Sequence, residues 1–355
     1  MLRHYKGSIL FSLVCLAIAM WYGWYQTGTI GGTLGLVWIV LVLSVLEISL
    51  SFDNAVVNAV VLEDMDEVWQ RRFLTWGMVI AVFGMRIVFP LAIVAIAAGL
   101  GPIEALNLSL NEPRRYEEIV SSAHIGIAGF GGAFLAMVGL SYFFDSDKEV
   151  HWIERLEAFL ARFSNIKAAE IALLLLALYL ISLMLDPADA LTFMVSGCLG
   201  LVTFIAVEAL GTILEMREEA MKLQGAVVRS GLGGFLYLNI LDASFSFDGV
   251  IGAFALSNNM VIIALGLSIG AMFVRSMTIH LVKKGTLAEY RYLEHGAFWA
   301  IIALGAIMLL SARFHITETV TGLIGAALIG LSLWWSIRHN RRLPDEEIDR
   351  ALNPD

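Results

Sequence analysis

Long hydrophobic runs, each about as long as a membrane-spanning helix, follow one another along almost the whole chain, and charged residues gather mainly between them. A transmembrane helix needs about 20 consecutive, mostly apolar residues. On this rule the pattern predicts ten spans, near residues 7–27, 33–61, 73–99, 123–144, 168–186, 190–211, 229–256, 260–281, 294–312 and 317–337.

The composition agrees with a membrane protein. Of 355 residues, 59% are hydrophobic and only 15% are charged, whereas a soluble domain has about 25% charged residues. The net charge of −9 gives no indication of nucleic-acid binding. Two isolated cysteines predict neither a disulfide framework nor a thiolate metal site. We therefore expect an all-α polytopic protein whose partners are the lipid bilayer and metal ions, with no nucleic acid; a homo-oligomer stays open.

The first apolar run, residues 9–25, follows a basic start, as a signal peptide would. It ends in Trp21, Tyr22, Trp24 and Tyr25, an interfacial aromatic belt rather than the small residues of a cleavage site. We interpret it as a retained span.

The distribution of Lys and Arg predicts the orientation, because short cytoplasmic loops carry the excess of basic residues. With ten spans and a cytoplasmic N-terminus, eighteen of the 23 basic residues fall on the cytoplasmic side and three on the other side. The remaining two, Arg86 and Arg275, fall inside spans. This predicts a multi-pass protein of the cell (inner) membrane with both termini in the cytoplasm.

An internal repeat appears when the chain is compared with itself at a shift of 195 residues: the segment 46–54 aligns with 241–249. An acid, two serines, a phenylalanine and a second acid recur, and an arginine follows in the next span of each half. Five spans per half make the repeats inverted, a transporter architecture. We expect one membrane domain over 1–355, with 1–186 as the first repeat plus an extra N-terminal span, 187–340 as the second, inverted repeat, and 341–355 as a cytoplasmic tail.

Acids inside spans are unfavourable and are usually kept for ion or proton pathways. Asp53 and Asp248 are therefore predicted to be functional, and structural ion pairs with Arg86 or Arg275 are the alternative. The supporting polar residues are Ser49, Ser51, Asn58, Ser244 and Ser246.

Helical geometry separates the acids of the first motif. Glu47, Ser51, Asn54 and Asn58 share one helical stripe, whereas Ser49 and Asp53 lie on roughly the opposite side. Either the helix unwinds near residues 49–53, as transporter spans often do, or the acids serve different faces. Carboxylate, hydroxyl and amide oxygens suit Mn²⁺, Mg²⁺ or Ca²⁺.

At these motifs the chain resembles the TerC family of integral membrane proteins, on Glu47, Leu50-Ser51, Asp53-Asn54, the pair Asp242 and Asp248, and the downstream arginines. The resemblance implies a duplicated cation-exporter fold, with members linked to manganese efflux or named for tellurium resistance. Carried over by position, it implies the metal ligands Glu47, Asp53, Asn54, Asp242 and Asp248. Gly249 departs from the pattern, because a polar residue is expected there, and the chain has more spans and longer loops than a compact member.

The leading hypothesis is that the protein exports a divalent metal ion as its substrate. Mn²⁺ is the favoured ion and Ca²⁺ or Mg²⁺ are the alternatives, and transport could be coupled to protons. The ion would lie between the repeats, and the arginines would offset the acids when it leaves. An enzyme is not expected. The alternatives are an intramembrane aspartyl protease, although neither Asp53 nor Asp248 lies in a Gly-x-Gly-Asp pattern, and a stress or assembly component that transports nothing.

Overall fold

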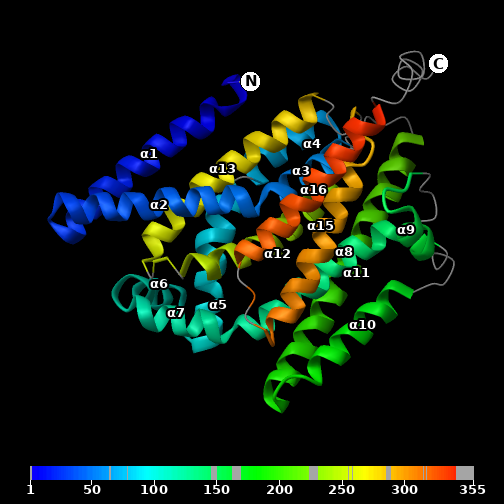
Figure 1. Ribbon diagram of the computed structural model, residues 1–355. Coiled ribbons are helices and arrows are strands. Elements are labelled where there is room, and N and C mark those ends of the chain that lie inside the picture. Colours follow the sequence, from blue (N-terminus) through cyan, green and yellow to red (C-terminus); the bar gives the residue numbers. More distant parts are fainter. Residues whose placement is uncertain are drawn as a thin grey trace.

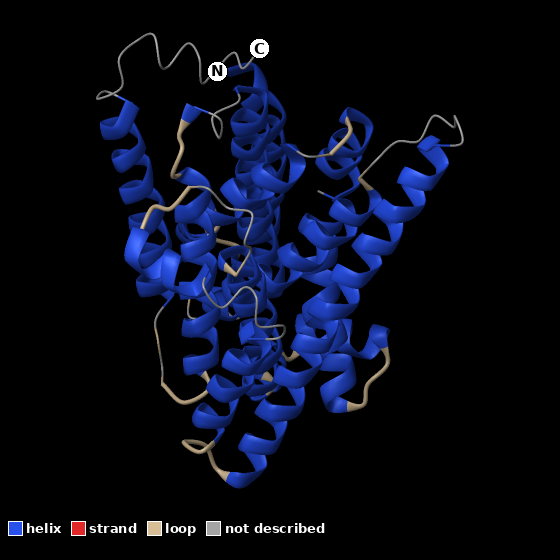
Figure 2. Cartoon of the chain, turned by 90° about the vertical axis from the view of Figure 1, so that its right-hand side faces the viewer, coloured by secondary structure: helices blue, strands red, loops and turns tan. Residues whose placement is uncertain are grey.

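The computed structural model shows helices joined by turns and loops, with no strand in the part of the chain that it describes (Figure 2). The described residues are 2–63, 65–77, 79–144, 150–161, 169–223, 231–254, 256–257, 259–284, 289–314, 316 and 318–340. The predicted all-α class is confirmed.

The first part of the chain folds into helices that begin with a hairpin, α1 against α2. Their bounds are α1 Leu2–Thr27, α2 Ile30–Leu50, α3 Phe52–Glu63, α4 Glu67–Arg72, η1 Phe73–Gly77, η2 Ile80–Val88, α5 Phe89–Ala98, α6 Pro102–Asn111, α7 Pro113–Ser122, α8 His124–Phe143, α9 Glu154–Ala161 and α10 Ala169–Ser182.

The remaining helices include α11, which at 37 residues is long enough to extend beyond a bilayer core of about 30 Å. Their bounds are α11 Pro187–Leu223, α12 Leu232–Phe254, α13 Met260–Lys284, α15 Leu293–Ser311 and α16 Glu318–Asn340. Figure 1 places the α1–α2 hairpin at one side of the molecule and α10 and α11 at the other.

Eight helices within the described residues are long and apolar enough to cross a membrane, which makes the chain a multi-pass membrane protein. They run over residues 5–27, 30–49, 67–96, 124–143, 187–214, 260–283, 293–311 and 320–340. Two of the ten predicted spans are not among them. The span at 168–186 is represented by the 14-residue helix α10, and that at 229–256 by α12, which carries the polar residues of the second motif.

The predicted span 33–61 is interrupted where the sequence indicated a break. Helix α2 ends at Leu50, Ser51 follows with φ −99° and ψ 18°, and α3 begins at Phe52. The second motif has no such interruption, because α12 is continuous from Leu232 to Phe254.

The predicted span 73–99 is wound in an unexpected way. Residues 73–77 and 80–88 form π-helix, and α5 continues as an α-helix from Phe89. π-Helical turns are rare and often occur at functional sites. Arg86 lies on the second of these π segments.

Among the described residues, the buried apolar side chains form two clusters. Both polar motifs lie where the chain passes from one cluster to the other. Along α2 and α3 the chain leaves the cluster that contains Leu43 and enters the one that contains Val56. Along α12 it passes in the opposite sense, from Leu241 to Val250. The two motifs therefore meet between the apolar clusters and run in opposite directions.

Candidate functional site

Glu47 and Arg86 form a buried ion pair at the end of α2. Nη2 of Arg86 donates to Oε1 of Glu47, and the side chains are only 6% and 3% exposed, respectively. Ser51, at the helix break, donates its hydroxyl to the same carboxylate oxygen over 3.2 Å. Nη1 of Arg86 donates to the carbonyl of Ala81, five residues earlier on the π segment. The interrupted helix and the π-helix thus supply the two members of this pair.

Two glycines of the second half receive the side chain of Glu47. A methyl group added at Gly249 of α12 would lie 2.8 Å from Oε2 of Glu47. A methyl group added at Gly270 of α13 would collide with Cβ and Cγ of the same side chain. Gly249, which departs from the expected polar pattern, therefore makes room for a carboxylate that comes from the other half of the chain.

Asp242, the first acid of the second motif, is held by amides of the first. Nδ2 of Asn58 donates to Oδ1 of Asp242 over 3.0 Å, and Asn54 hydrogen-bonds the same carboxylate. All three side chains are less than 9% exposed. The other atom of the Asn58 amide, Oδ1, is buried and has no hydrogen-bond partner among the described residues. The Oδ1 atom of Asn58 is therefore available as a metal ligand beside the Asp242 carboxylate.

A small cavity of about 30 Å³ lies beside Asp242 and its two asparagine partners. Its polar lining comes from Asn54, Asn58, Asp242, Thr278, the buried Arg86 and the half-buried Arg275. Nε of Arg275 donates to the carbonyl of Leu74 on η1 over 2.6 Å. A cavity needs at least about 10–15 Å³ to hold a water molecule, so this one has room for a water molecule or a bare cation.

The structure thus brings together Glu47, Ser51, Asn54, Asn58 and Asp242, with Arg86 paired to the first acid and Arg275 at the same cavity. In the stripe expected on the first motif helix, Glu47, Asn54 and Asn58 are buried and Ser51 is half-buried. Ser49 lies on the other side, as the helical geometry predicts.

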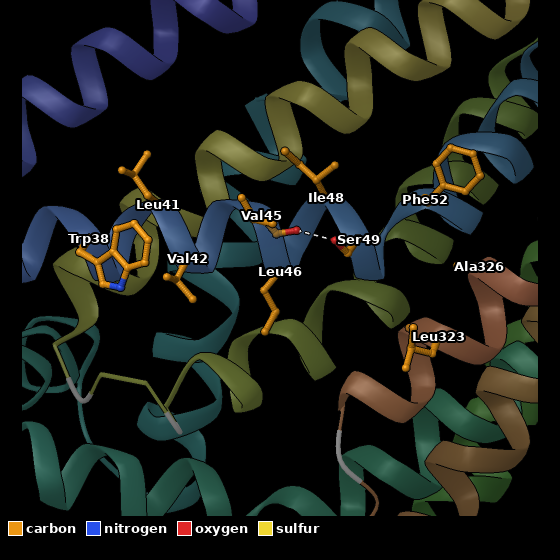
Figure 3. Close-up of a pocket in the computed structure, with 11 residues that line it drawn as sticks. Trp38, Leu41, Val42, Val45, Leu46, Ile48, Ser49, Phe52, Leu323 and Ala326 are labelled. Atoms are coloured by element: carbon orange, nitrogen blue, oxygen red, sulfur yellow. Dashed lines mark hydrogen bonds between the residues drawn. The ribbon is translucent and has the colours of Figure 1, made fainter.

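Ser49 is exposed toward a wide apolar groove between α2 and α16, and its hydroxyl bonds to the carbonyl of Val45 (Figure 3). Ser244 is buried and bonds to the carbonyl of Ile240 on its own helix. Neither serine therefore joins the cluster.

The side chains of Asp53, Ser246 and Asp248 lie outside the described part of the structure. Within the described part, no three His, Cys, Asp or Glu side chains form a group that could hold a metal ion. The described donors are two carboxylates and two carboxamides, contributed by α2, α3 and α12.

Three features of the site were not predicted from the sequence. Gly270 carries no polar group and lies 223 positions from the glutamate that it accommodates. Thr278 and the carbonyl of Leu74 belong to ordinary apolar spans. The one local signal was Gly249, because it replaces a polar residue of the repeated motif.

The comparison with known families corrects the expected resemblance. Membership of the TerC family is wrong, because the family model that matches is a different one. No curated protein and no solved structure matches the chain. The matching model covers residues 52–343, which include Asn58, Arg86, Asp242 and Arg275 but not Glu47. The chain therefore belongs to the family described as "Protein of unknown function (DUF475)".

Proposed function

We propose that the protein carries a divalent metal cation, Mn²⁺ in preference to Ca²⁺ or Mg²⁺, across the membrane through the polar cluster between its two halves. One observation supports this above the others. Glu47 and Asp242 come from motifs far apart in sequence, yet both are buried in the same group of polar oxygen atoms, between the two apolar clusters. Buried acids in membrane helices are rare and usually mark ion pathways. The donors are hard oxygens, without the thiolates that soft ions prefer.

An inverted repeat is part of the proposal, and the packing of the helices supports it. Helix α2 packs on α13, which carries Arg275, and α12 packs on η2, which carries Arg86. In the same way, α3 of the first half packs on α15 of the second, and α12 of the second half packs on α8 of the first. Within the halves, α8 packs on α10 and α15 packs on α16. Such a symmetry allows each half to close one side of a central site.

The proposed topology has ten spans, with α10 and α12 crossing in addition to the eight long apolar helices. The protein then lies in the inner membrane of the cell with both termini in the cytoplasm. This agrees with the excess of basic residues on the cytoplasmic side. Export, the outward direction of transport, is part of the same proposal.

The test is ion flux with the purified full chain in liposomes, comparing Mn²⁺, Ca²⁺, Mg²⁺ and Zn²⁺. Asp242→Asn should lower Mn²⁺ flux at least about tenfold, because one charged donor is worth 1.4 kcal/mol or more at a buried site. Asp53→Asn and Asp248→Asn test the two acids whose side chains are not described. Glu157→Gln is the matched control, because Glu157 is a buried acid on α9, outside the candidate spans. Unchanged Mn²⁺ flux in all three Asp variants would refute the proposal.

A further inference from the structure

Arg86 lies between the acids of the two halves. Its guanidinium pairs with Glu47 of α2 and also acts electrostatically on Asp242 of α12. It lines the cavity beside Asp242 and Asn58. Nε of Arg86 is buried and has no hydrogen-bond partner among the described residues. The guanidinium is therefore held by its ion pair with Glu47 and by one backbone carbonyl, that of Ala81.

Arg275, the corresponding residue of the second half, is held differently. Its Nε donates to the Leu74 carbonyl, and no carboxylate among the described residues forms an ion pair with it. Both arginines line the same cavity. Of the two arginines, only Arg86 therefore forms an ion pair with an acid among the described residues.

A carrier whose empty site holds two unneutralised acids cannot easily change its access from one side to the other, because each buried, unpaired charge costs several kcal/mol. Such a carrier releases one ion only when another replaces it. A cation tethered to the protein relieves this restriction, because it pairs with one acid and reduces the net charge of the site when the site is empty.

We propose that Arg86 is a tethered substitute for the transported cation: it pairs with Glu47 when the site is empty and is displaced when a divalent cation binds. The emptied carrier then returns across the membrane without a second ion, so net flux does not require exchange or protons. This inference rests on the proposed transport function and adds its mode of coupling.

The experiment measures two fluxes of radioactive Mn²⁺ with the full chain in liposomes: net uptake into Mn²⁺-free vesicles, and exchange into vesicles loaded with unlabelled Mn²⁺. Arg86→Gln should lower net uptake at least about tenfold relative to exchange, because the empty site loses its neutralising charge. It should also bind Mn²⁺ at least about tenfold more tightly, because the tethered competitor is gone. Arg275→Gln is the matched control and should change both fluxes by the same factor.

The outcomes separate this inference from the proposed function. Absence of both fluxes in the unmodified protein refutes the transport function itself. Arg86→Gln with an unchanged ratio of net uptake to exchange overturns the role of Arg86. If that variant loses both fluxes, tighter Mn²⁺ binding supports the inference, and unchanged or weaker binding overturns it. If it does not fold, Arg86→Lys decides: the shorter tether should lower the ratio while Arg275→Lys leaves it unchanged, and equal ratios overturn the inference.

Discussion

The two halves of the molecule hold their buried acids in different ways. In the first half, Glu47 is paired with the arginine of the same half, and it reaches across into a slot formed by Gly249 and Gly270. In the second half, Asp242 accepts hydrogen bonds from neutral amides of the first. One acid is thus paired directly with a charge, and the other accepts hydrogen bonds from neutral amides.

The supporting helices differ in the same sense. The acid of the first half lies before a helix break at Ser51, and its arginine lies on π-helix. Both corresponding residues of the second half lie on continuous α-helices. Irregular backbone is therefore concentrated where the charge pair lies. In the proposed function, the first half therefore holds the charge pair that a bound cation would separate, and the second half provides a regular frame.

The largest effect is expected from breaking the charge pair. Glu47→Gln leaves the Arg86 guanidinium buried without its acid, which should destabilise the protein by about 3–5 kcal/mol. Thermal unfolding in detergent measures this, with Asp242→Asn as the comparison, because Asp242 has no direct arginine partner among the described ion pairs. Equal losses for the two variants would contradict the distinction between the halves.

A smaller effect is expected at Glu157, which shows how a buried acid behaves outside the candidate spans. Burial opposes its ionisation, but hydrogen bonds from His295, Trp299 and the backbone of Ile153 outweigh this and lower its pKa from 4.5 to about 2. Because the folded-state pKa is depressed, the carboxylate contributes stability above pH 4.5 that is lost as the pH falls towards about 2.

Glu157→Gln should therefore lower the melting temperature at neutral pH, and its difference from the unmodified protein should shrink as the solution is acidified. Mn²⁺ flux should not change, since Glu157 does not line the cavity. A constant difference in melting temperature across the acid range would show that ionisation of Glu157 does not stabilise the fold. Loss of Mn²⁺ flux in Glu157→Gln would show that transport does not depend specifically on the acids of the two motifs.

The sequence predicted those features that depend on local pattern. Long apolar runs predicted the spans. The incompatible faces of Glu47 and Asp53 left two alternatives, and one of them, a helix break, lies at Ser51. The stripe that contains Asn58 was also predicted. The pairing of Asn58 with Asp242, 184 positions away, could not be predicted from spacing, because it depends on tertiary packing. The π-helical winding around Arg86 leaves no signal either, since residues 73–88 have the composition of an ordinary apolar span.

The smallest effect tests whether the second half really fixes Glu47. Gly270→Ala places a methyl group against Cβ and Cγ of Glu47, near its backbone, where the side chain cannot move away. Overpacking of this kind costs about 1–3 kcal/mol. Gly35→Ala is the matched control, because Gly35 is also helical but has open space around it, and alanine there should be neutral or stabilising by up to about 1 kcal/mol. Thermal unfolding of the two variants distinguishes them. If Gly270→Ala is as stable as Gly35→Ala, α13 does not clamp Glu47, and the first acid is held by Arg86 and Ser51 alone.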